Sequence, residues 1–377
     1  DGNSSRGKGG TAEIVEYAVG IRRPVIIIST ISPFDIIVRE GCGLNAESIS
    51  GIEMFNRFPV SEREMQAYAE NMHYQLFDTE EGRKLPDEIK NDIREKLLPY
   101  YVRGSKIGKY NQKIYRYAGL FVYTFSALAV ASVAIGTLVH GLSIFAFTLE
   151  LLLLLSILFI VFFAHRKHTH RKWIENRFLT ERIRSAIFFA ACSIEASPIE
   201  VPPYMGIAHG PDDWMVKAFN EIWNRLPQMK GCHGESCKPL IEFIRKIWVQ
   251  DQIKYHEYRS EKVGKISHAL ERSGIVIFML AVIAALSHVI LSFVCHQIDV
   301  KWLEHGLTFM ALVLPAVGAA IGGISLHREY SRIEKRSQHM ITNLKQLDER
   351  LSRISKPEEF ESLLREMEEL TLRETQD

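Results

Sequence analysis

The stretch from Gly119 to Ala164 limits most strongly what this chain can fold into. Its first half, GLFVYTFSALAVASVAIGTLV, carries no charge, and its second half, LSIFAFTLELLLLLSILFIVFFA, carries only Glu150. Each half has about 21 residues, and a helix of that length covers the roughly 30 Å of a bilayer's hydrocarbon core. Neither half shows the polar stripe of a soluble helix. With only His140-Gly141 between them, the two halves predict a tight membrane hairpin.

A second pair of apolar stretches runs from Gly274 to Cys295 and from Gly306 to Leu326, and the short loop HQIDVKWLEH joins them. Basic amphipathic segments flank both pairs, so the order of basic helix, span, turn, span and basic helix occurs twice. We therefore expect a mainly α, polytopic membrane protein. It should have four transmembrane helices in two hairpins, long cytoplasmic helices and an N-terminal α/β (Rossmann-like) remnant.

The overall composition hides this pattern, because it averages apolar spans with very polar flanks. The 377 residues carry a net charge of only +1, which argues against a nucleic-acid partner, since such proteins normally present a basic face. The five cysteines are scattered and odd in number, so no disulfide framework is indicated. The sequence gives no reason to expect a cofactor.

The N-terminal residues predict one α-β unit. A glycine-rich loop leads into an amphipathic helix at about residues 11–21, and Val25 to Ser29 reads as a buried strand. The backbone amides of Gly9, Gly10 and Thr11 would lie at the helix N-terminus, where the helix dipole favours a phosphate. The same loop can equally be a plain tight turn. Because one strand cannot make a sheet, we expect the rest of this domain to lie upstream of Asp1 or to be missing.

The segments GKGGTAEIVEYA and PVIIIST resemble the last loop, helix and strand of the SLOG superfamily of Rossmann-like nucleotide sensors and nucleotide-processing enzymes. Related hydrolases carry PGGxGTxxE with a catalytic glutamate. This chain has Gly9-Gly10-Thr11-Ala12-Glu13, without the glycine before Thr11 and with a different spacing to Glu13. The resemblance therefore implies nucleotide binding at Gly9, Gly10, Thr11 and Glu13, and we expect no catalytic residue.

The remaining segments divide as follows. We expect residues 1–31 to end the SLOG-like domain, 32–105 to form surface helices that link it to the membrane, and 106–194 to hold the first hairpin with a cytoplasmic helix. Residues 195–236 should be a loop-rich linker, 237–355 the second hairpin with its flanking helices, and 356–377 an acidic, frayed tail. Apolar residues from Leu326 to Ile354 follow steps of four and three, which predicts either a coiled coil or a helix packed on the cytoplasmic helices.

Two clusters could be read as metal sites. HRKHTHRKW, from His165 to Trp173, holds three histidines, but its lysines and arginines would repel a cation, so we interpret it as a collar facing lipid headgroups. GCHGESC brings together only three candidate ligands, and we expect free thiols rather than zinc at this segment, which contains Cys232, His233 and Cys237.

The twofold pattern, with WVQDQIKYH before the third span and REYSRIEKRSQHM after the fourth, resembles the SLATT family of SMODS- and SLOG-associating two-transmembrane effectors of bacterial conflict systems. This resemblance covers roughly residues 85–355. It implies a pore-forming or channel-forming membrane effector, controlled by a nucleotide-sensing domain, that acts in anti-phage defence as a homo-oligomer in the lipid bilayer. The alternative is a membrane-tethered nucleotide-processing enzyme whose catalytic domain is incomplete in this chain. A transporter is a third reading, for which the apolar spans leave little room for a substrate site.

Lysine and arginine crowd the outer ends of both hairpins and are scarce in the two turns, where Lys301 is the single example. The positive-inside rule then predicts that both termini lie in the cytoplasm and that the chain is a multi-pass protein of the inner (cell) membrane. Glu150 lies about 9–12 Å along the second span, which makes it a candidate pore residue. It could instead lie at headgroup depth.

Overall fold

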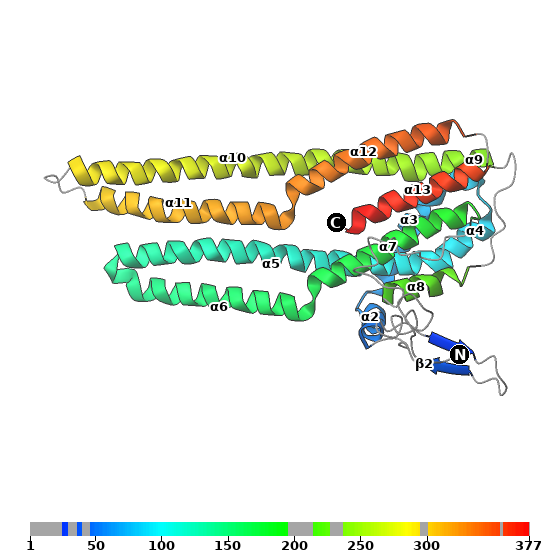
Figure 1. The fold of residues 1–377 in the computed structure, drawn as a ribbon, viewed down its shortest axis with the longest axis horizontal. Coiled ribbons are helices and arrows are strands. Elements are labelled where there is room, and N and C mark those ends of the chain that lie inside the picture. The colour runs from blue at the N-terminus through cyan, green and yellow to red at the C-terminus, as the bar shows by residue number, and fades with distance from the viewer. Residues whose placement is uncertain are drawn as a thin grey trace, which may run out of the picture. The chain divides into compact units, whose positions relative to one another are not determined.

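The computed structural model describes residues 25–28, 36–39, 46–194, 214–226, 237–294, 301–354 and 357–376, and most of them are α-helical (Figure 1). The chain divides into two compact units. The smaller consists of Asp1–Pro59 with Ser197–Glu221, and the larger of Val60–Ala196 with Ile222–Asp377.

In the smaller unit, strand β1 (Val25–Ile28) pairs antiparallel with strand β2 (Ile36–Arg39). Helix α2 (Ala46–Arg57) packs on helix α8 (Trp214–Trp223), with the rings of Phe55 and Trp214 5.8 Å apart. The strand predicted at Val25–Ser29 is thus present. Its described pairing is antiparallel, however, whereas a Rossmann sheet pairs its strands in parallel. The predicted helix at residues 11–21 lies outside the described residues.

The larger unit consists of two similar halves. The first contains α3 (Glu62–Phe77), the 3₁₀ turn η1 (Gly82–Lys84), α4 (Asp87–Asp92), the π-helix η2 (Ile93–Leu97), α5 (Leu98–Leu138), the 3₁₀ turn η3 (His140–Leu142), α6 (Ser143–Lys167) and α7 (Thr169–Ala191). The second contains α9 (Cys237–Phe243), the π-helix η5 (Ile244–Val249), α10 (Gln250–Val294), α11 (Lys301–Arg328), α12 (Tyr330–Ser352) and α13 (Pro357–Gln376).

The halves share two irregular landmarks, which support the repeat seen in the sequence. A π-helical turn precedes the long helix of each half, η2 before α5 and η5 before α10. A residue in the left-handed conformation ends the second apolar helix of each half, His168 with φ 49° and Glu329 with φ 52°. This conformation is uncommon for a residue with a Cβ, so its recurrence at matching positions marks a built-in bend rather than an accident of one loop.

Four helical segments are long and apolar enough to cross a membrane, and they lie in α5, α6, α10 and α11. These helices contain the four predicted spans. They form a single row in the order α10, α11, α5, α6, in which each helix packs against the next (Figure 1). Only 6% of the most apolar window of the α6 segment is buried. A row of this kind has apolar surface on both faces, as expected for helices that contact lipid.

The charged end of the larger unit is a helical bundle built around α7. Fifteen residues of α7 are buried, among them Leu179, Ile183 and Phe189. The sequence predicted an amphipathic helix here, with one buried face, but α7 is buried more extensively because it packs against both α5 and α13. The prediction of surface helices at 32–105 was also wrong for Phe77, Ile93 and several neighbouring apolar residues, which are buried in the same core.

Helix α12 packs along α10 within the same chain, and its apolar seam is buried from Met340 to Leu351. Of the two alternatives for this seam, packing on other helices of the same chain is the observed one. The predicted frayed tail at 356–377 was wrong. Residues 357–376 form α13, whose apolar face is buried against α7 and α12 because its hydrophobic residues recur at helical spacing: Phe360, Leu363, Leu364 and Met367.

A buried ion pair joins α13 to α7. The Arg182 guanidinium donates to the Glu368 carboxylate at 2.6 Å, and both side chains are less than a tenth exposed. Burial raises the pKa of Glu368 and lowers that of Arg182, while the attraction between the two charges opposes both changes. The pair therefore holds α13 in one position, and loss of either partner leaves a charge in an apolar core.

Arg182→Met should detach α13, because it leaves the buried Glu368 carboxylate without its hydrogen-bonded partner at a cost of about 3–5 kcal/mol. Hydrogen exchange of the α13 backbone amides should then accelerate. The double variant Arg182→Met/Glu368→Leu should recover most of the protection. The matched control is Arg350→Met, which breaks the half-exposed Arg350–Glu366 pair and should cost less than about 1 kcal/mol. Parent-like exchange in Arg182→Met would contradict the prediction.

Candidate functional site in the membrane-spanning helices

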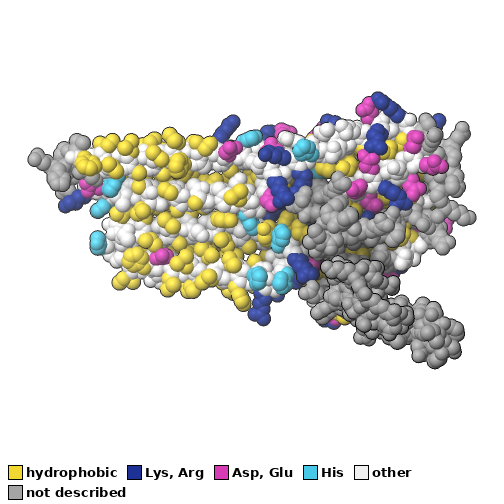
Figure 2. Space-filling model, in the orientation of Figure 1, with side chains coloured by type: hydrophobic (Ala, Val, Ile, Leu, Met, Phe, Trp, Pro, Cys, Tyr) yellow, Lys and Arg dark blue, Asp and Glu magenta, His cyan; other side chains and the backbone are white. Residues whose placement is uncertain are grey.

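Hydrophobic side chains cover the end of the larger unit that holds α5, α6, α10 and α11, and charged side chains gather toward the other end (Figure 2). The four helices contact one another through small residues. The Ser132 hydroxyl of α5 donates to the Ala146 carbonyl of α6 at 2.6 Å, and a Cβ at Gly136 would lie 2.9 Å from the Ala146 Cβ. Small residues allow close backbone approach, which is how helices associate inside a membrane without a hydrophobic driving force.

Glu150 lies on α6 one helical turn after Ala146 and is half-buried. Because residues four apart share a face of a helix, this position belongs to the side of α6 that contacts α5. The carboxylate is therefore directed toward a helix interface rather than fully into lipid. A charged group in hydrocarbon is costly, so an interface or a water-filled path is the expected location for it.

A second polar pair in the spans was not predicted. The Thr308 hydroxyl of α11 lies 3.2 Å from Nε2 of His288 on α10, and it also donates to the Glu304 carbonyl at 2.8 Å. The signal was available in the sequence, since His288 interrupts an otherwise apolar run. Polar groups within spans mark helix contacts or ion paths.

The two halves interlock where the apolar helices meet the charged bundle. A Cβ at Gly119 of α5 would overlap the ring of His327 on α11, and a Cβ at Gly323 of α11 would overlap the ring of Tyr123 on α5. Each helix thus inserts a ring against a glycine of the other. The ring of His327 also lies 4.5 Å from that of Tyr115, and its Nε2 lies 3.2 Å from the Tyr115 carbonyl.

A polar cavity of about 350 Å³ lies on the charged side of this junction, between α3, α5, α7 and α10. Among the charged residues that line it, the cations outnumber the carboxylates: Lys109, Arg177, Arg184 and Arg259 against Glu181 and Asp251. Four aromatic rings complete the lining: Tyr68, Tyr101, Trp173 and Tyr255. Burial raises the pKa of Tyr101, which keeps its hydroxyl protonated. Positive charge beside flat rings suits an anionic ligand with a planar group.

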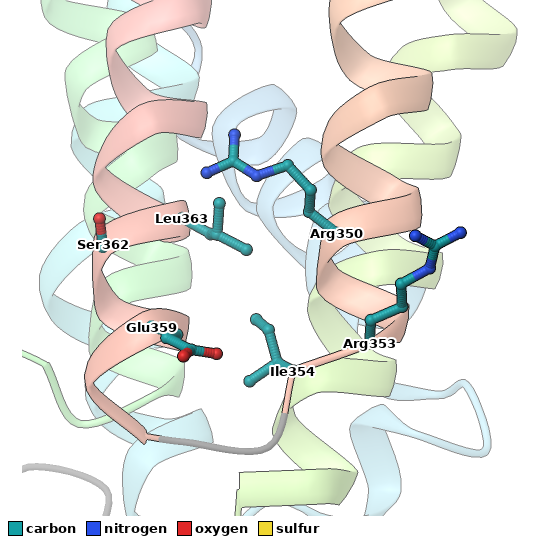
Figure 3. Close-up of a pocket in the computed structure, with 6 residues that line it drawn as sticks. All are labelled: Arg350, Arg353, Ile354, Glu359, Ser362 and Leu363. Carbon is teal, nitrogen blue, oxygen red and sulfur yellow. The ribbon is translucent and has the colours of Figure 1, made fainter.

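A second hollow, of about 320 Å³, lies between α12 and α13. Arg350 extends from α12 toward α13, whereas Arg353 points away from the hollow (Figure 3). Arg350 already pairs with Glu366 at 2.7 Å. This hollow therefore offers a ligand little beyond the side chains that hold α13.

Among the described residues, no three His, Cys, Asp or Glu side chains lie close enough together to hold a metal ion. The histidines of the 165–173 cluster are among these described residues. Cys232 and His233 lie outside the described residues, as do the predicted nucleotide-binding residues Gly9, Gly10, Thr11 and Glu13. No family model, curated protein or solved structure matches the chain.

Gly323→Ala should weaken the contact between α5 and α11, because the new methyl group must displace the Tyr123 ring, at a cost of about 1–3 kcal/mol. The thermal unfolding midpoint in detergent should fall accordingly. The adjacent Gly322→Ala is the matched control, since a Cβ there meets no atom within 4 Å. Equal midpoints for the two variants would show that the interlock contributes no stability.

Proposed function

We propose that the protein is a membrane-embedded effector that forms a pore or channel as a homo-oligomer and opens in response to a nucleotide. In this proposal the SLOG-like N-terminal segment senses the nucleotide, the membrane is the inner (cell) membrane, and the setting is a bacterial conflict system. Both termini and the charged bundle lie in the cytoplasm, as the distribution of lysine and arginine indicates.

The observation that supports this proposal best is the continuity of the two long helices. Helix α5 has 41 residues and α10 has 45, and each runs without a break from the charged bundle into the apolar row. At about 1.5 Å per residue they are roughly 60–68 Å long. A displacement of either helix in the bundle is therefore carried into a span. This is the mechanical link that a gated membrane protein needs.

The polar cavity gives the proposal a described site at which a soluble anion could act. Its lining on α5 lies between Tyr101 and Gln112, which is 7 to 18 residues before the first span at Gly119, or roughly 10–27 Å along the helix. This is deeper in the cytoplasm than the roughly 5–8 Å layer of lipid headgroups on each side of a bilayer. A ligand there would contact both α5 and α10.

The enzyme alternative requires turnover of a nucleotide, and the transporter reading requires a substrate site within the spans. Ion flux through proteoliposomes of the purified chain separates these functions. We expect flux that depends on an added nucleoside phosphate, with the nucleotide recovered unchanged. Nucleotide hydrolysis without flux would favour the tethered enzyme, and saturable exchange of a solute would favour the transporter.

Two variants test which part of the chain binds the nucleotide. Gly10→Val should abolish the nucleotide response if the Gly9-Gly10-Thr11 loop binds the phosphate, because its side chain blocks close approach to the backbone amides. Arg177→Ala should abolish it if the cavity binds the ligand. Lys265→Ala, which removes an exposed lysine paired with Glu261 on α10, is the control for a changed cation. A response that survives in both test variants would contradict both sites.

Glu150 provides a test of conduction itself. Glu150→Gln should weaken the preference for cations over anions several-fold without changing assembly, because it removes one negative charge per subunit from the row. Glu150→Leu should also reduce the flux. Reversal potentials measured under a salt gradient report the preference. Conduction like that of the parent in both variants would exclude Glu150 from the ion path and direct attention to His288 and Thr308.

A further inference from the structure

The two halves of the larger unit can be matched residue by residue from their landmarks. Leu97 ends η2 where Val249 ends η5, and this match sets the register of α5 against α10. His168 and Glu329 are the left-handed residues that end the second apolar helices, and this match sets α6 against α11.

Contacts within each half confirm this register. Counting from the landmarks, Gly136 corresponds to His288, and Phe147 corresponds to Thr308. A Cβ at Gly136 would lie 3.2 Å from the Phe147 ring, and the Thr308 hydroxyl lies 3.2 Å from His288 Nε2. The same positions thus meet in both halves, near the ends of the apolar helices that the hairpin turns join.

The contact that joins the halves is of a different kind. It sets α11, the second apolar helix of one half, against α5, the first apolar helix of the other. The row therefore ends with a first apolar helix, α10, at one edge and a second apolar helix, α6, at the other (Figure 1). The free face of α10 corresponds to the face of α5 that contacts α11. The free face of α6 corresponds to the face of α11 that contacts α5.

We propose that α6 of one copy packs against α10 of the next copy in the way that α11 packs against α5 within the chain. This inference rests on the proposed function in that it assigns the contact that builds the homo-oligomer. Because the contact joins two different faces, it is heterologous, and repetition of a heterologous contact closes a ring when the rotation permits.

The residues at the two edges support this pairing by charge. In the internal contact, Gly119 faces His327. Counting from the landmarks, the position of Gly119 corresponds to Glu271 on α10, and that of His327 corresponds to Arg166 on α6. The equivalent positions at the two free edges thus carry opposite charges. The Glu271 side chain is 70% exposed, and Arg166 is exposed beside the Phe162 ring.

One helical turn further into the apolar row, the side chains at the two edges also support the proposed α6–α10 contact by their shape. The internal pair of Tyr123 and Gly323 corresponds to Ile275 on α10 and Phe162 on α6. Ile275 is 59% exposed and Phe162 is 60% exposed. An apolar pair therefore follows the charged pair at the same spacing as in the internal contact. A lipid tail could cover the apolar pair, but it would not explain opposite charges at matching positions.

Disulfide trapping tests the contact directly. With the five native cysteines replaced, Phe162→Cys/Ile275→Cys should form a ladder of cross-linked dimers, trimers and larger species in native membranes after mild oxidation. The two positions cannot react within one chain. They lie at opposite edges of the row, three helix spacings or roughly 24–30 Å apart, whereas a disulfide requires Cβ atoms about 4 Å apart.

The matched control is Phe162→Cys/Val276→Cys. Val276 is 56% exposed at nearly the same depth, but it lies about 100° further around α10 and so faces away from the proposed contact. A ladder from the Ile275 pair with at least about a fivefold weaker ladder from the Val276 pair would support the contact. Equal ladders, or chains that stay monomeric in both, would overturn it.

A charge reversal provides a second test that leaves the apolar surface intact. Arg166→Glu and Glu271→Arg should each reduce the ladder of the Phe162→Cys/Ile275→Cys protein several-fold, and the two reversals together should restore it, because opposite charges are regained. Failure of the double reversal to restore the ladder would overturn the ion pair. Flux measurements on the same proteins separate the two proposals. A ladder without flux would retain the contact and contradict the channel, whereas flux without this ladder would do the reverse.

Discussion

A polypeptide inside hydrocarbon has no water to satisfy its backbone N–H and C=O groups, so a helix that crosses a membrane must make all of these hydrogen bonds itself. The larger unit obeys this constraint by placing most of its irregular backbone outside the apolar row. The π-helical turns end at Leu97 and Val249, well before the first span of each half. The left-handed residues His168 and Glu329 come after the second span of each half. Pro315 of α11 is the exception within a span. The result is two long rods, α5 and α10, that can transmit a displacement because nothing interrupts them.

The spans could be predicted from the sequence because their determinant is local. A run of apolar residues without a polar stripe has few alternatives, and its ends are marked by charge. The partners of the polar helices were harder to predict. Helical spacing shows that α12 and α13 bury one face, but not against which helix, and the acidic composition of 357–376 obscured Phe360 and Leu364. For the same reason, no sequence pattern indicates that Arg182 is buried against Glu368, 186 positions further along the chain.

The candidate site likewise contains residues that the local sequence reveals and residues that only the fold brings together. Glu150 was recognised because a lone carboxylate in a span is conspicuous, whereas the His288–Thr308 pair depends on two helices coming together. The cavity between α3, α5, α7 and α10 draws its charged and aromatic residues from four separate helices, so no motif could reveal it. The nucleotide loop at Gly9, Gly10 and Thr11 stays a prediction, since it lies outside the described residues.

The repeat within one chain has a consequence for assembly at low abundance. Because one chain carries both halves, their association is an intramolecular event, whose effective concentration is set by the length and stiffness of the connection between α7 and α9. The α11–α5 contact therefore forms in every copy, however few copies the membrane holds. In any assembly that repeats this contact, half of the joints are present before two molecules meet. Only the α6–α10 joints then respond to the amount of protein, which halves the number of encounters needed to complete a closed structure.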